Sequence, residues 1–231
     1  VELDGKDGKP LAAVVVGKAS PGLYGGGHGG VYVRREGENQ AWLAAGDLEA
    51  PSDALALVGR DVIDVPSAEV ARVTLDRDGA PRVTLARPDP KATEFTTDAM
   101  LPEGRKLDPV KVEELTGSLG SLSMEDVRPA AEVTIPPDAP RSRFETFGGL
   151  TVEVAVASLG QGETAERWAT FAVAAAPATA PQADTEAKPP PKRAEELAAR
   201  LQGWAFRLPP YLADRLTGGL DQLLAEPEPA S

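Results

Sequence analysis

The chain has 231 residues, of which 42% are hydrophobic and 26% are charged, and its formal net charge is −12. These proportions are ordinary for a globular protein, and the negative charge argues against nucleic acid and anionic membrane surfaces as partners. The sequence contains no cysteine, which excludes disulfides, thiolate nucleophiles and cysteine zinc sites.

The first third of the chain predicts short strands and one helix. In the stretch GVYVRREGENQAWLA (30–44), alternating residues around Tyr32 precede the polar turn Glu36-Gly37-Glu38-Asn39, a pattern typical of a β-hairpin. Val31 and Val33 are expected to face the core, so this hairpin is predicted to be scaffold. The remaining predictions here are strands at 11–17 and 61–65 and a helix at 52–58. The longest apolar run, 11–16, is much shorter than the roughly 20 residues that a membrane-spanning helix needs.

The middle third predicts a hairpin followed by a helix. Strands at 70–76 and 81–87 are joined by the turn Arg77-Asp78-Gly79-Ala80, and further strands are predicted at 94–97 and 122–127. A helix is predicted at 109–119. Asp108 is expected to cap its N-terminus, with Pro109 in the first helical position. Gly120 is expected to supply a left-handed C-terminal cap.

The last third repeats this order of elements. Strands are predicted at 150–157, 167–174 and 204–208, and helices at 194–202 and from Leu212 to Leu223. Residues 175–192 are polar and rich in proline, which favours a mobile loop or tether.

These predictions together give an α+β fold that is rich in β-structure. We expect mostly antiparallel sheets built from hairpin–helix–strand units, with the helices packed on one face. The units would span residues 1–66, 67–130 and 131–226, with a disordered insert at 175–192 and a tail at 227–231. The alternative is that the similarity of the three parts is only the alternation found in any α+β protein.

The sequence contains two candidate sites, a glycine motif and a single histidine. Gly25, Gly27 and Gly30 match the G-x-G-x-x-G pattern, but a strand follows them where a dinucleotide site needs a helix. They are interpreted as a loop. His28 is the only histidine, so a histidine metal cluster is excluded, and a general base would need partners that the sequence does not place nearby.

Paired carboxylates occur at Glu113-Glu114 and Glu125-Asp126. Glycoside hydrolysis needs two carboxyl groups about 5–10 Å apart in a groove, whereas neighbouring helix residues point in different directions. These acids are interpreted as solvated surface charges. The sequence therefore predicts no enzyme, no catalytic residue, and no cofactor or metal site.

Three aromatic residues near the C-terminus form the candidate partner-binding cluster: Trp204, Phe206 and Tyr211. Aromatic side chains dominate the energetics of protein interfaces. The alternative is that the strand around Phe206 packs its aromatic side onto the core.

Four stretches resemble, in the same order, the bacterial domain of unknown function 4340 family. They are GKASPGLYGGGHGGVYVRREGENQAWLAAGDL, VGRDVIDVPSAEVARVTL, LTGSLGSLSMEDVRPA and GWAFRLPPYLADRL. The resemblance implies a domain outside the cytoplasm, tethered to the inner membrane by an N-terminal helix that would precede Val1. It also implies an association with gliding-motility-type ABC transporters.

From this resemblance we expect a periplasmic accessory or adaptor domain without enzymatic activity. Its partner would be an ABC transporter permease or a sister extracytoplasmic subunit. The alternatives are an envelope glycan or peptide hydrolase that uses paired carboxylates, and a soluble ligand-binding module.

Overall fold

The computed structural model describes residues 2–4, 9–24, 28–45, 55, 59–160, 162, 165–178 and 190–226. The chain divides into two compact units, Val1–Val58 and Gly59–Ser231, and each is described by itself. Several predicted segments lie outside the described residues: the glycines 25–27, the helix at 52–58 except Leu55, residues 179–189 of the insert, and the tail 227–231.

The first unit contains an antiparallel sheet in the order β1-β2-β3-β4. Its strands are β1 (Glu2–Asp4), β2 (Pro10–Tyr24), β3 (His28–Arg35) and β4 (Ala41–Ala45). The predicted β3–β4 hairpin is confirmed, with Gly37 at a φ of 79° in its turn. Val31 is buried and Tyr32 is exposed, as the alternation predicts.

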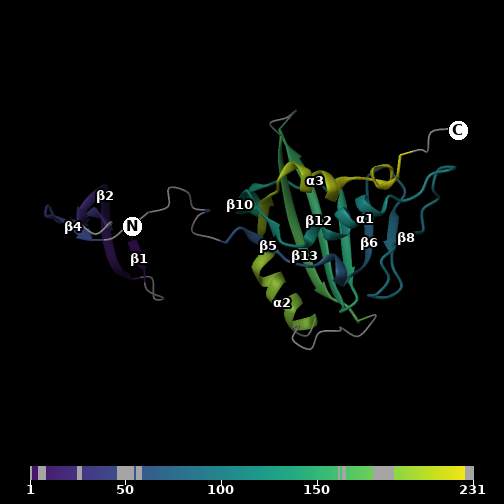
Figure 1. The fold of residues 1–231 in the computed structure, drawn as a ribbon, viewed down its shortest axis with the longest axis horizontal. Helices are drawn as coiled ribbons and strands as arrows, with labels where there is room; N and C mark the ends of the chain where they lie inside the picture. The colour runs from purple at the N-terminus through teal and green to yellow at the C-terminus, as the bar shows by residue number, and fades with distance from the viewer. Residues whose placement is uncertain are drawn as a thin grey trace. The chain divides into compact units, whose positions relative to one another are not determined.

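The second unit is built on an eight-stranded sheet in the order β10-β14-β13-β12-β11-β6-β7-β8 (Figure 1). All of its strand pairs are antiparallel. The strands are β6 (Val70–Asp76), β7 (Val83–Ala86), β8 (Thr96–Thr97), β10 (Asp126–Pro129), β11 (Arg141–Thr146), β12 (Leu150–Leu159), β13 (Glu166–Ala175) and β14 (Trp204–Arg207). A separate pair joins β5 (Asp61–Ile63) to β9 (Leu122–Ser123).

One face of this sheet forms the main core. The register places Val73 opposite Phe144, and Phe144 opposite Val152, and all three side chains are fully buried. The helices that cover this face are α1 (Pro109–Thr116), α2 (Pro190–Leu201) and α3 (Pro210–Thr217) (Figure 1). The predicted fold class, an α+β protein with mostly antiparallel sheets, is confirmed.

The opposite face is covered only at one end by the described residues. The chain from β10 to β11 crosses it, beginning with the 3-10 turn Ala130–Glu132. Val133 and Ile135 from this crossing segment pack on Trp168 and Ala205, which form a small second core. The remainder of this face, towards Thr146 and Leu150, carries mainly polar side chains.

Both edges of the large sheet are short, and an aspartate binds peptide groups at each. At one edge, the carboxylate of Asp98 accepts the Thr84 amide at 2.8 Å, and the Asp98 amide donates to the Thr84 carbonyl. At the other edge, the amide of Val127 in β10 donates to the carboxylate of Asp126 at 2.9 Å. These contacts occupy groups that another strand could otherwise pair with.

Three predicted elements in the second unit have the wrong boundaries. The predicted strand at 122–127 is two strands, β9 and β10. Helix α2 begins four residues early, at Pro190, so the insert is shorter than predicted. The last predicted helix ends at Thr217, because Gly218 is extended, and a separate 3-10 turn follows at Leu220–Leu223.

The C-terminal end of α1 also differs from the prediction. Asp108 caps the N-terminus as expected, accepting the amides of Val110 and Lys111. The α-helix ends at Thr116 and a 3-10 turn continues to Leu119. Gly120 is extended rather than left-handed, with a φ of −76°. The left-handed residue is Ser121, whose amide donates to the carboxylate of Asp64.

The predicted division at residues 66 and 130 stays a prediction about repeated units. In the structure, strands from 67–130 and 131–226 lie together in the eight-stranded sheet. No helix among the described residues is long and apolar enough to cross a membrane.

Candidate functional site

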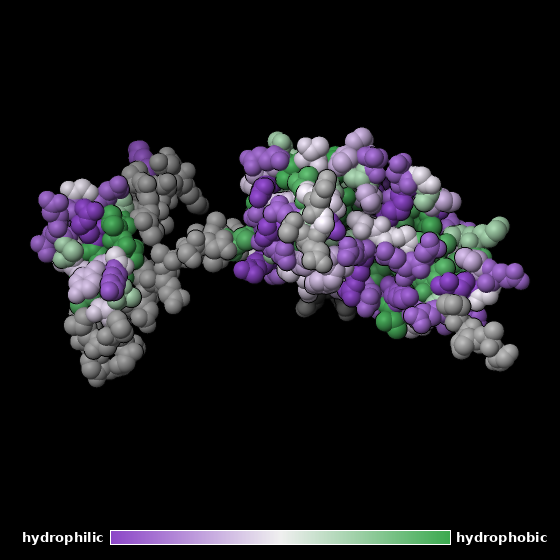
Figure 2. All heavy atoms as spheres, turned by 90° about the horizontal axis from the view of Figure 1, so that it is seen from above, coloured by the Kyte–Doolittle hydropathy of each residue, from purple (hydrophilic) through white to green (hydrophobic). Residues whose placement is uncertain are grey.

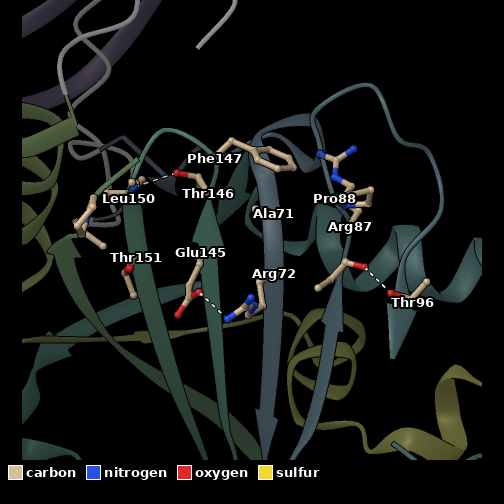
Figure 3. A pocket seen from close by; sticks show the side chains of 14 residues that line it. Ala71, Arg72, Arg87, Pro88, Thr96, Glu145, Thr146, Phe147, Leu150 and Thr151 are labelled. Carbon is tan, nitrogen blue, oxygen red and sulfur yellow. Dashed lines mark hydrogen bonds and ion pairs between the residues drawn. The ribbon is translucent and has the colours of Figure 1, made fainter. Parts of the chain in front are cut away.

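A groove runs across the open face of the large sheet, perpendicular to its strands. The register aligns side chains from neighbouring strands into a row that forms its floor. Glu145 lies opposite both Thr151 and Arg72, Arg72 lies opposite Ala86, and Ala86 lies opposite Thr96. This row, Thr151–Glu145–Arg72–Ala86–Thr96, therefore crosses five strands. Figure 3 labels Thr151, Glu145, Arg72 and Thr96 of the row.

One wall of the groove is formed where the strands end. It includes Arg87-Pro88 after β7, Phe147 and Gly149 between β11 and β12, and Ala176-Pro177 after β13. The amide of Ala176 donates to the Gly149 carbonyl at 2.7 Å, which fixes the last part of this wall against the β11–β12 turn. The groove encloses about 620 Å³, within the range of ligand pockets in proteins.

The charged side chains Glu145 and Arg72 on the floor differ in their ion-pair contacts. Glu145 is held by Arg143 of the same strand, with a nitrogen–oxygen distance of 3.1 Å, and lies 3.8 Å from Arg72. The Arg72 side chain is 54% exposed. Because Arg143 already neutralises Glu145 at the shorter distance, Arg72 offers its guanidinium to the groove.

Two threonines of the groove have opposite hydrogen-bonding states. The hydroxyl of Thr146 accepts the Leu150 amide at 2.9 Å (Figure 3). Thr151 is only 5% exposed, and its hydroxyl oxygen has no hydrogen-bond partner in the described part of the chain. An unpaired buried hydroxyl costs on the order of 1–3 kcal/mol, so this group needs an explanation.

Arg87 lines the same groove, but its donors are occupied. Its guanidinium donates to the carbonyls of Val70, Ser67, Ala68 and Ala92, and it lies between the rings of Phe95 and Phe147. Burial lowers the pKa of Arg87 from its ordinary value. This arginine holds the wall together, while Arg72 faces the groove.

The structure separates the three aromatic residues of the predicted partner-binding cluster. Phe206 is 6% exposed and packs edge to face on Phe171, with ring centroids 5.7 Å apart. Trp204 is 44% exposed at the start of β14, and Tyr211 is 60% exposed on α3 beneath Arg215. Phe206 is therefore a core residue, whereas a binding role for Trp204 and Tyr211 stays a prediction.

The predicted carboxylate pairs each have their own partners. Glu113 accepts a hydrogen bond from Ser67 at 2.6 Å, and Glu114 pairs with Arg215 at 3.1 Å. Glu125 pairs with Arg207, and Asp126 with Arg128. Each of these four carboxylates therefore interacts with a different side chain.

Two sequence features remain, the single histidine and the acidic residues as possible metal ligands. The backbone of His28 lies in β3. Among the residues that the structure describes, no group of three or more histidine, aspartate and glutamate side chains could hold a metal ion.

Sequence reasoning missed the groove because its residues come from alternate positions of five strands. The strand at 150–157 is predicted from its apolar residues, and Thr151 lies on the opposite side of that strand. Glu145 belongs to β11, whose sequence RSRFET has one large apolar residue and gave no prediction of a strand. The signal that could have indicated the groove is the set of polar residues at alternate positions of these strands.

The fold defines the chain as a β-rich α+β protein with one helix-covered sheet face and one groove-bearing face. The sequence profile of the family described as domain of unknown function DUF4340 matches residues 1–140. That match spans more than half of the chain, and the chain belongs to this family. Searches of the curated proteins and of the solved structures give no match.

Proposed function

We propose that this chain is a non-enzymatic binding domain that serves as the extracytoplasmic accessory or adaptor of an ABC transport system. It would be tethered to the inner membrane by a segment preceding Val1. The partner would be the transporter permease or a sister extracytoplasmic subunit. Family membership supports this proposal through the context that the resemblance implies.

The observation that carries the proposal is the open half of the large sheet. The helices occupy the other face, and the crossing segment covers one end only. The open half presents exposed Arg72, Arg143 and Ala172 beside a groove. A rigid sheet face with a polar groove suits docking, because its side chains are already fixed by the strands.

The polarity of the surface fits contact with another protein. Hydrophilic residues predominate on the side of this unit that Figure 2 shows, with smaller hydrophobic areas between them. Interfaces that form and separate are about as polar as the rest of a protein surface. On the open sheet face, Arg72 and Arg143 are exposed charged side chains, in keeping with such a polar interface.

Site-specific photo-crosslinking of the full-length protein in its native membrane tests this proposal. A benzophenone amino acid at Ala172 lies on the open face, and one at Glu195 lies on the exposed side of α2 as the matched control. We expect a permease or sister subunit to be crosslinked from position 172 and not from position 195. Recovery of no transporter subunit from either position would overturn the adaptor role.

The location is tested separately by protease treatment of spheroplasts that contain the full-length protein. We expect the domain to be digested from outside while the inner membrane stays intact. Protection until the membrane is lysed would contradict an extracytoplasmic domain.

A further inference from the structure

The shape of the groove favours a linear occupant. Its floor runs from β12 to β8, which are four inter-strand steps apart. Neighbouring strands are about 4.8 Å apart, so the floor is about 19 Å long. At about 3.3 Å per residue, this length accommodates an extended segment of about five or six residues.

This occupant would be recognised by side chains rather than by strand pairing. The groove crosses the strands, whose backbone groups are already used in the ladders between β12, β11, β6 and β7. The edge that could accept another strand beside β7 is occupied by Asp98. Specificity would therefore come from Arg72, Glu145, Thr151 and Thr96.

The charges on the floor favour an acidic occupant. The guanidinium of Arg72 is exposed and lies 3.8 Å from Glu145, which Arg143 contacts at 3.1 Å. Arg72 also interacts electrostatically with Asp98, which does not line the groove. The charged residues that line the groove are Arg72, Arg87 and Glu145, which together leave one positive charge, in a chain whose net charge is −12. A guanidinium binds carboxylates in a bidentate geometry that a lysine cannot match.

The hydroxyl of Thr151 supplies a second, independent indication of a ligand. It is a buried donor without a partner among the residues that the structure describes, and it lies opposite Glu145 on the groove floor. A peptide carbonyl oxygen seated over Thr151 would come within reach of this hydroxyl once the threonine side chain rotates about χ1. The cost of leaving this hydroxyl unpaired would then be recovered on binding.

We propose that the groove binds an extended acidic peptide of about five or six residues, with an aspartate or glutamate side chain on Arg72 and a peptide acceptor on Thr151. A peptide is favoured over an acidic sugar, because the described residues that line the groove offer no exposed aromatic ring for a sugar to stack on. The inference deepens the proposed adaptor function and rests on it for the source of the peptide, a segment of a partner subunit.

Fluorescence anisotropy with labelled hexapeptides and the purified chain tests this inference. The probes are a peptide with alternating glutamate, the same peptide with glutamine, and the same peptide with lysine. We expect the glutamate peptide to bind at least tenfold more tightly than the other two, and its affinity to fall as salt rises. Equal binding of the glutamate and glutamine peptides, or no binding of any, would overturn the proposal. So would binding of a uronic-acid oligosaccharide in place of the peptide.

Two variants connect the binding to the groove. Arg72→Glu is expected to reduce affinity at least tenfold, and Thr151→Val several-fold. The control is Arg82→Glu, since Arg82 is an exposed arginine of the same unit that pairs with Asp76 at 2.6 Å and does not line the groove. It should stay within twofold of the wild type. Circular dichroism must show all three variants folded, and an equal loss in Arg82→Glu would refute the assignment to the groove.

The failure of this inference can be told apart from failure of the adaptor role. If crosslinking from position 172 recovers a transporter subunit but no acidic peptide binds, only the groove assignment falls. If the acidic peptide binds but no transporter subunit is recovered, the groove assignment stands and the adaptor role falls.

Discussion

Thr146 and Thr151 show how one hydroxyl stabilises the fold while another of the same type does not. They lie on neighbouring strands at the same groove, and both are at most 5% exposed. Thr146 accepts a backbone amide, and the oxygen of Thr151 has no described partner. Residue type and burial are therefore the same, and the hydrogen bond differs.

We predict opposite effects on stability when each threonine is changed to valine. Thr151→Val removes an unpaired polar group and should raise the free energy of unfolding by about 1 kcal/mol. Thr146→Val leaves the Leu150 amide without its acceptor and should lower it by about 1–3 kcal/mol. Urea denaturation of the two variants measures both values. A loss of stability in Thr151→Val would show that its hydroxyl already has a partner in solution.

A single carboxylate also gives the fold a dependence on pH. The pKa of Asp98 is lowered from its ordinary value, mainly because the Thr84 amide donates a hydrogen bond to the carboxylate. A carboxyl group with a lowered pKa in the folded state contributes stability above its unfolded pKa of about 4. That contribution is lost as the pH falls through the folded pKa.

We therefore predict that Asp98→Asn weakens the dependence of stability on pH below about 5. The variant should be less stable than the wild type at pH 7, and the two should converge at low pH. Denaturation curves at a series of pH values measure this difference. Asp78→Asn is the control, because Asp78 is exposed in the β6–β7 turn. If Asp98→Asn and the wild type keep a constant difference at every pH, the charge is not the cause.

At the scale of elements, the turn between β11 and β12 shapes the groove. Gly149 has a φ of 83°, and a side chain at this position would collide with the Ala176 carbonyl. Two separate constraints thus require glycine here. The turn between β6 and β7 contains Gly79, which has a φ of 70° and no atom within 4 Å of an added Cβ.

These two glycines allow the constraints to be separated. Gly79→Ala should cost about 1 kcal/mol, from the left-handed backbone alone. Gly149→Ala should cost at least about 3 kcal/mol, because the collision adds to the backbone strain. Differential scanning calorimetry would show the larger drop in Tm for Gly149→Ala. Equal drops would mean that the chain after β13 moves aside freely.

The same elements show how far the sequence predicts the structure. Strands with several apolar residues on one side, such as β6 and β12, were predicted to within a few residues, because alternation and burial agree. β11 was missed, since two of its three inward residues are Ser142 and Thr146. Their burial depends on α3, whose Leu216 carbonyl accepts the Ser142 hydroxyl at 2.7 Å, and on a turn. Such long-range partners leave no local pattern.

At the scale of the whole molecule, the family match and the second compact unit end at different residues. The match ends at residue 140, directly before β11. The strands β11, β12, β13 and β14 occupy the middle of the large sheet, between β10 and β6. Residues 59–140 alone would therefore lack the strands that join the two edges and bury the core.

We predict that residues 59–231 fold independently, whereas residues 59–140 do not. The longer polypeptide should unfold cooperatively, with a Tm close to that of the corresponding transition in the full chain. The shorter one should show no cooperative transition and little dispersion in its amide NMR spectrum. A dispersed spectrum for 59–140 would show that its four strands of the large sheet, β6, β7, β8 and β10, can build another core.

The aspartates at the two sheet edges have a consequence for crowding. If the domain is tethered to a membrane as proposed, its copies would meet at high local concentration, and unpaired edges would let their sheets join edge to edge into fibrils. With Asp98 and Asp126 on edge peptide groups, dense arrays of this domain should remain dispersed. Neutralising either acid would be expected to shorten the lag before aggregation.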